Sequence, residues 1–256
     1  MPNTIDAHSV SKLTKGLYRS DTKEELGSVG VGYEPVQNVK AFAFFDTICQ
    51  THGAVYKSAT SFNGGAKVIL TAEFPKPVTI VKGDDLMTQF VLVNGFDGKV
   101  GLHANFWVKR LVCINGLVAN VPDAKNSVHL KHTKNIEIRM EDAMKVLTEG
   151  MKYFDRFIEM SKILAEKVVD GNMVDKFLED VFGEAKSTKA RNIIENVVDR
   201  FENGMGNNGK TAWDLYNGVT EYIDHEHGRD GTRLESSLLG AGANKKAKAF
   251  NAAMAL

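Results

Sequence analysis

The apolar residues of this 256-residue chain change their spacing near Ile138, and this change limits the possible fold more than any other feature of the sequence. Before Ile138 they alternate with polar residues in short runs, as from Val100 to Val108, which is the period of a half-buried strand. After it they recur every three or four residues from Met140 to Val168, as on helices that pack in a bundle. The sequence therefore predicts an α+β fold: a helix packed on an antiparallel β-meander, followed by a helical C-terminal half.

Turn signals predict the strands of the meander. Asn-Gly at residues 63–64 separates two runs with strand character, and Asn-Gly with Asp-Gly at residues 94–98 separates two more. A helix that ends at Gly53 precedes these strands, and residues 111–121 are expected to turn into a short helix. The resulting regions are a polar N-terminal arm (1–28), an α+β core (29–137) and a helical region (138–256) that packs on the core or on neighbouring subunits.

The segment GMGNNGKT, from Gly204 to Thr211, matches the phosphate-loop pattern G-x-x-x-x-G-K-[ST]. That pattern binds phosphate only where a buried strand leads into the loop. Here the preceding residues have helical spacing, with Ser187 as a candidate N-cap, and TAWD after the loop has the form of a capping box. We therefore interpret the segment as a link between two helices, with Gly204 in a left-handed conformation at the end of the first.

Composition places the chain among ordinary globular proteins, since 43% of its residues are hydrophobic and 25% are charged. It contains no run of eighteen apolar residues and no signal-peptide core, so we expect neither a membrane span nor export. Cys49 and Cys113 have no metal-type spacing and are expected to be buried, reduced thiols. The expected location is the cytoplasm of a bacterial host cell.

The net charge is zero, but basic residues are concentrated in one window. Residues 99–139 contain seven Lys or Arg residues and two carboxylates, Asp123 and Glu137, which is a local excess of five positive charges. Such an excess favours an anionic partner, although a solvated linker would have the same composition.

The fourth strand combines basic side chains with an aromatic ring on one face. Residues of even number from Val100 to Val108 are apolar and should face the core. The opposite face suits single-stranded DNA, because lysines attract phosphates and a base can stack on Trp107. The alternative is that helices cover this face and Trp107 belongs to the core. The candidate nucleic-acid-binding residues are Lys99, His103, Asn105, Trp107, Lys109, Arg110, Lys131 and Lys134.

The run from Asp224 to His227 raises the question of a metal-dependent enzyme. Two histidines beside carboxylates could chelate a cation, but no further ligand follows at a recognised spacing, and the same residues could simply charge a helix end. No nucleophile motif is visible, and neither cysteine has a recognisable catalytic context. We therefore predict a protein that is not an enzyme and has no cofactor and no metal.

Three blocks carry a family resemblance, in order VGVGYEPVQNVKAFAFFD, RLVCINGL and TAWDLYNGVTEYIDHEHGR. They resemble the phage/plasmid-like family catalogued as domain of unknown function nine-thirty-two. Relatives commonly read RVVCxNTL in the second block, whereas this chain has Leu111 and Gly116. The resemblance implies a phage or mobile-element setting and no catalytic residues. The predicted topology is also similar to that of Rad-type single-strand annealing proteins, which typically form rings that hold single-stranded DNA in a basic groove.

These observations predict a non-enzymatic, single-stranded DNA-binding and annealing protein of a phage-type DNA recombination system. We expect it to be a homo-oligomer, for which a ring is one arrangement. Its expected partner is single-stranded DNA, and no membrane association is expected. The alternative is a structural or host-interaction oligomer that does not bind nucleic acid.

Overall fold

The computed structural model describes residues 5–118, 127–148, 150–228, 233, 236–237 and 240–256. The chain forms two compact units. The first unit comprises Met1–Pro75, Thr88–Phe106 and Ala124–Tyr153, and the second comprises Lys76–Met87, Trp107–Asp123 and Phe154–Leu256. The expected regions 29–137 and 138–256 differ from these units, because residues 76–87 and 107–123 group with the C-terminal helices.

The first unit begins with a small antiparallel sheet made of β1 (Ile5–Ser9), β2 (Thr14–Arg19) and β3 (Glu25–Gly30). The sequence predicted only a polar arm over residues 1–28. These strands were missed because each buries only one or two apolar side chains, so no alternation is visible. The buried residues are Ile5, Leu17, Leu26 and Val29.

The larger sheet has the strand order β10-β8-β7-β5-β4, with β6 paired to β7 and β9 paired to β8. Its strands are β4 (Val55–Phe62), β5 (Lys67–Glu73), β6 (Val78–Val81), β7 (Asp84–Gly95), β8 (Leu102–Arg110), β9 (Gly116–Leu117) and β10 (Ser127–Leu130). The predicted meander is confirmed, since β4, β5, β7 and β8 are neighbours in chain order. A 3-10 turn over Asn63–Gly65 joins β4 to β5 at the predicted Asn-Gly signal.

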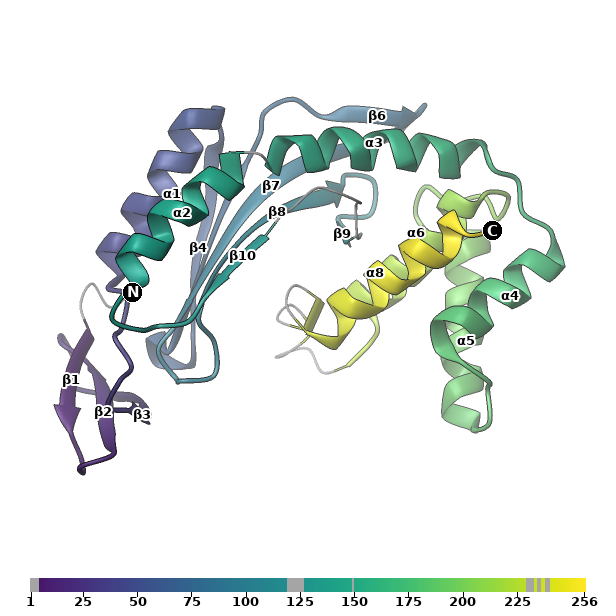
Figure 1. Ribbon diagram of the computed structural model, residues 1–256. Helices are drawn as coiled ribbons and strands as arrows, with labels where there is room; N and C mark the ends of the chain where they lie inside the picture. Colours follow the sequence, from purple (N-terminus) through teal and green to yellow (C-terminus); the bar gives the residue numbers. More distant parts are fainter. Residues whose placement is uncertain (1–4, 119–126, 149, 229–232, 234–235, 238–239) are drawn as a thin grey trace. The chain divides into compact units, whose positions relative to one another are not determined.

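Two helices of the first unit cover one face of its strands, and they lie side by side in Figure 1. They are α1 (Asn38–His52) and α2 (Ile136–Thr148). As predicted, α1 ends at Gly53, which has a left-handed φ of 68°. Phe45 of α1 stacks on Phe90 of β7 at 4.9 Å, and Ile136 of α2 belongs to the same apolar core.

The second unit contains most of α3 (Gly150–Glu166) and all of α4 (Gly171–Phe182), α5 (Thr188–Asn203), α6 (Ala212–His225) and α8 (Ala241–Met254). Helix α6 is its centre, because it contacts both α5 and α8 and every residue from 212 to 223 is buried. Phe157 of α3 stacks on Phe250 of α8 at 5.1 Å. The helical C-terminal half is therefore confirmed, and no described helix is long and apolar enough to span a membrane.

The segment from Gly204 to Thr211 joins α5 to α6, and a helix rather than a strand leads into it. The side chain of Ser187 caps α5, and Thr211 with Asp214 forms the predicted capping box. The predicted left-handed conformation of Gly204 is wrong, since its φ is −66°. Glycine is needed there for a different reason: a Cβ atom would lie 2.3 Å from the carbonyl oxygen of Arg200.

Residues 111–118 form a turn and then β9, so the short helix predicted over 111–121 is wrong within the described part. The backbone N–H of Arg110 donates to Asn115 O at 2.9 Å, which closes the turn, and Ile114 has a φ of 60°. That left-handed residue is incompatible with a continuing helix. Both cysteines are free and buried, as predicted.

Candidate nucleic-acid interface

The alternation predicted for β8 is confirmed. Residues of even number from Leu102 to Val108 are buried, and His103, Asn105, Trp107 and Lys109 on the other face are half-buried. Along β8, His103 and Asn105 belong to the first unit, whereas Trp107, Lys109 and Arg110 belong to the second. The eight candidate residues are therefore not one continuous site within one unit.

Arg110 is buried inside the second unit, and this contradicts its predicted contact with phosphate. Its side chain is fully buried and donates to both carboxylate oxygens of Asp84, at 2.8 and 2.7 Å. Further donations go to the carbonyl oxygens of Met205 and Gly206 and to Asn207 Oδ1. The physical reason is strand parity: position 110 lies on the same inward face as Val108.

Trp107 is partly covered within the second unit. Lys246 Nζ lies 5.7 Å from the centroid of its ring, and a Cβ atom on Gly116 would lie 3.2 Å from the ring. These contacts leave less free ring face than an open stacking platform would have, so the structure gives the predicted stacking role of Trp107 little support.

A pocket of about 430 Å³ in the first unit brings together two of the predicted lysines. Lys99 and Lys131 are both exposed and line it. Tyr33, His129 and His132 add three rings, and the remaining lining residues are Gly30, Gly32, Gly98, Val100, Gly101 and Thr133. The pocket thus combines positive charge, aromatic rings and glycine backbone.

His132 lines this pocket with an almost fully buried ring. Only 3% of its surface is exposed, and its Nδ1 accepts a hydrogen bond from Val36 N at 3.4 Å. In the neutral tautomer, Nε2 therefore carries the proton, and Nε2 has no partner among the described residues. Burial, followed by the charge of His129, lowers the pKa of His132 to about 4, so the ring is neutral at pH 7. A buried donor without a partner costs about 1–3 kcal/mol.

Ring contacts hold His132 and His129 in place. Tyr33 stacks on His132 at 4.8 Å and donates its hydroxyl to Gly95 O at 2.8 Å. His129 of β10 stacks on His103 of β8 at 3.7 Å, in register with it. Burial, followed by neighbouring positive charge, lowers the pKa of His103 to about 4 and also lowers that of His129. At neutral pH the positive charge of the pocket therefore comes from its lysines.

The other predicted residues of the first unit lie apart from this pocket. Lys134 lines a neighbouring pocket of about 360 Å³ with Glu34 and Lys40, and Asn105 pairs with Ser127 across β8 and β10. Sequence reasoning missed three pocket residues, Tyr33, His129 and His132. The two histidines lie inside the basic window, and Tyr33 lies inside the first family block, so a signal existed for each.

Asp224 and Glu226 of the Asp224 to His227 run form hydrogen bonds and an ion pair inside the second unit. Asp224 accepts hydrogen bonds from Gly116 N at 2.8 Å, from Lys246 Nζ at 2.7 Å and from Ser237 Oγ. Glu226 pairs with Arg200 at 2.5 Å. In the part of the chain that the structure describes, no group of three potential ligands is placed to hold a metal. The run therefore contributes to internal contacts of this unit.

The comparison with curated proteins and the comparison with solved structures each found no match. The similarity to Rad-type annealing proteins consequently remains a prediction. A family model does match, over residues 25–250, which is most of the chain. The chain belongs to the family described as Domain of unknown function (DUF932).

Proposed function

We propose that this protein binds single-stranded DNA without catalysing a reaction, and that the pocket of the first unit holds one nucleotide of the strand. The observation that carries the proposal is the Nε2–H of His132, a buried donor without a partner among the described residues. The His132 ring lines the same pocket as Lys99 and Lys131, so we infer that a small rotation of the ring would direct this donor to a ligand. Together these groups offer two charges and one directed hydrogen bond to an anionic ligand.

Each group has a counterpart in a nucleotide. Lys99 and Lys131 would attract a phosphate, and His132 would donate to a phosphate or base oxygen. Gly98 and Gly101 also line the pocket and add polar backbone groups to its wall. The volume of about 430 Å³ falls within the range of roughly 300–1,000 Å³ that is typical of pockets for small organic ligands.

A recessed pocket favours single strands over duplexes. Single strands present nucleotides that are free to leave the stack, whereas a duplex must be unpaired first, at a cost of a few kcal/mol. Annealing further requires several nucleotides to be held open at once, which repeated subunits achieve by presenting identical sites. We therefore include self-association in the proposal. The resemblance of the three sequence blocks adds the phage-type recombination setting.

A second candidate function is a structural or host-interaction protein that assembles through β4 and does not bind nucleic acid. This strand is an edge of the larger sheet, and all its residues from Val55 to Ser61 are exposed. Exposed edges are templates for pairing with another chain. The exposed edge is compatible with both functions, so a measurement of nucleic-acid binding distinguishes between them.

The test is fluorescence anisotropy of a labelled single-stranded oligonucleotide titrated with the full chain over a range of salt. Lys99→Ala and Lys131→Ala should each weaken binding and lower the slope of log K against log salt by about 0.7. His132→Asn keeps an acceptor close to the position of Nδ1 and removes the Nε2 donor. It should weaken binding about tenfold at an unchanged slope, because that contact releases no ion.

Lys12→Ala is the matched control, since Lys12 is exposed and does not line the pocket. Equal binding by wild type and all four variants would remove the pocket from the proposal. Absence of binding by the wild type would place the structural function first, and equal affinity for a duplex would contradict single-strand preference.

A further inference from the structure

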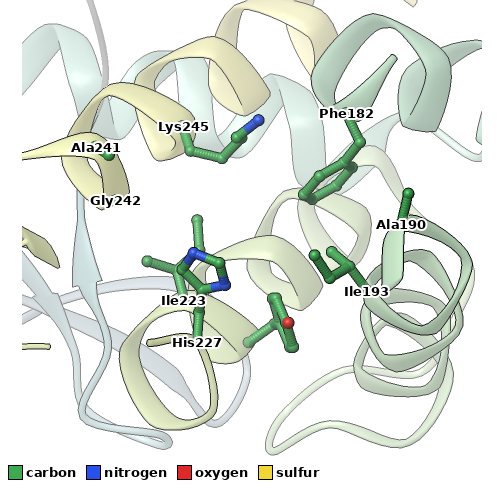
Figure 2. A pocket seen from close by; sticks show the side chains of 9 residues that line it. Phe182, Ala190, Ile193, Ile223, His227, Ala241, Gly242 and Lys245 are labelled. Atoms are coloured by element: carbon green, nitrogen blue, oxygen red, sulfur yellow. The ribbon is translucent and has the colours of Figure 1, made fainter. Parts of the chain in front are cut away.

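A second pocket, of about 250 Å³, lies within the helical second unit and has no role in the proposed DNA binding. Four helices contribute to it: the end of α4, the beginning of α5, the end of α6 and the beginning of α8. Figure 2 shows Phe182 and Ile193 on one side of the hollow and Lys245 and His227 on the other. The pocket therefore has an apolar side and a basic side.

Phe182 and Ile193 form the apolar side, and Tyr222 of α6 also lines the pocket. Ile223 adds an apolar side chain next to His227, across the hollow from Phe182 (Figure 2). Such walls favour a hydrocarbon or aromatic group, because contact removes apolar surface from water. The volume is below the range of about 300–1,000 Å³ for drug-sized ligands, so the occupant is small.

The basic side holds a lysine with weak internal partners. Lys245 Nζ lies 5.0 Å from the centroid of the Phe182 ring and donates to Val181 O at 3.2 Å. Lys248 Nζ donates to the same carbonyl oxygen at 3.3 Å, so two ammonium groups share one neutral acceptor. Among the described residues, no carboxylate forms an ion pair with Lys245 or Lys248.

Positive charge is also concentrated around His227. Burial, and then the charges of Lys189, Lys245 and Arg233, lower its pKa. Burial and the charge of Lys248 lower the pKa of Lys245 in the same way. The nearby Glu226 does not compensate for this excess, because it is paired with Arg200. Ala241 and Gly242 also place the N-terminus of α8 at the pocket, and this end of a helix carries partial positive charge.

We propose that this pocket binds a small amphipathic anion, with its carboxylate at Lys245 and its apolar body against Phe182, Ile193 and Ile223. The anion supplies a charged acceptor, which no described residue gives to Lys245, and its body fills the apolar side. His227 closes the basic side as a neutral hydrogen-bonding ring. This site belongs to the second unit alone and is independent of the DNA-binding proposal.

The test uses benzoate as the probe and benzyl alcohol as its uncharged counterpart, with the methyl NMR signals of Ile193 and Ile223 in the full chain as the readout. Benzoate should shift both signals in a saturable manner, and benzyl alcohol should bind at least tenfold more weakly. Lys245→Gln should weaken benzoate binding about tenfold, which is the effect expected from loss of one charge-assisted hydrogen bond of about 1.4 kcal/mol. Ala190→Leu should also weaken it, because the larger side chain fills part of the lined space.

Lys248→Gln is the matched control, since Lys248 shares the Val181 acceptor but does not line the pocket. It should change benzoate affinity by less than twofold. The proposal is overturned if millimolar benzoate leaves both isoleucine signals unchanged, if benzyl alcohol binds as tightly as benzoate, or if Lys248→Gln weakens binding as much as Lys245→Gln.

Discussion

Arg110 and Asp84 form a bidentate ion pair in the interior of the second unit, at 2.8 and 2.7 Å. The indole Nε1 of Trp213 donates to the same carboxylate at 2.7 Å. Arg110 is 0% exposed and Asp84 is 3% exposed, so neither charge is solvated in the folded state. The pair joins the beginning of β7 to the end of β8, and the indole adds α6.

Asp84→Asn should strongly destabilise the protein, because it leaves the Arg110 charge buried without its counter-ion. The expected loss in the free energy of unfolding is about 3–5 kcal/mol, measured by urea denaturation. Lys176→Ala is the control: its ion pair with Asp180 is exposed, and its loss should cost at most about 0.5 kcal/mol. If both variants lost a similar free energy of unfolding, the buried pair would contribute no more to stability than the exposed one.

Gly204→Ala should destabilise the link between α5 and α6. The added Cβ would lie 2.3 Å from Arg200 O and 2.7 Å from Glu221 Oε2, so the backbone must shift. We expect a loss of more than about 2 kcal/mol in unfolding free energy. Gly171→Ala is the control at a helix terminus with open space, and it should instead stabilise by about 0.4–1 kcal/mol. A neutral Gly204→Ala variant would contradict the close approach.

The stability of the first unit should fall in mild acid because of His132. Its pKa is about 4 in the folded state against an ordinary 6.5, so folding favours the neutral ring. The contribution is complete above pH 6.5 and is lost as the pH falls through 4. Between pH 7 and pH 5, this residue alone should remove about 2 kcal/mol of unfolding free energy.

Urea denaturation of the wild type and His132→Asn at both pH values measures this effect, since the variant should lose about 2 kcal/mol less than the wild type. His8→Asn, which changes an exposed histidine of β1, should retain the pH dependence of the wild type. If His132→Asn has the same acid sensitivity as the wild type, protonation of His132 is not its cause.

Self-association should occur at micromolar concentration, with β4 as the contact. Val55 on this edge is 57% exposed, and Val55→Lys should shift light scattering toward the monomer, because edge lysines oppose strand pairing. Val168→Lys is the control, since Val168 is 73% exposed and lies outside β4. A monomeric wild type would remove the ring from the proposed function, whereas an effect of Val168→Lys alone would move the contact to the second unit.

Local signals in the sequence predicted several features correctly because the deciding interactions lie within a few residues. The stop of α1 at Gly53 and the capping box of Thr211 and Asp214 depend only on neighbouring backbone and side chains. The hairpin at Asn63 has the same local origin. For this reason the rejection of the phosphate loop needed no tertiary information.

Strand parity was also present in the sequence but was not applied consistently. The alternation of β8 placed Val108 inside, and the same count places Arg110 inside. Its positive charge suggested a phosphate contact, whereas its position required an internal partner. That partner, Asp84, lies 26 residues away, and no local pattern links the two.

The sequence by itself determined the α+β class, the helix caps, the inward face of β8 and the basic character of residues 99–139. Only the tertiary structure decided which basic residues meet. Lys99 and Lys131 come together beside Tyr33 and His132 because β10 pairs with β8 and brings distant segments to one pocket. Helix caps and strand faces follow from short-range sterics and hydrogen bonds, whereas a pocket depends on which surfaces pack together. That choice depends on burial across the whole unit, which no short stretch of sequence contains.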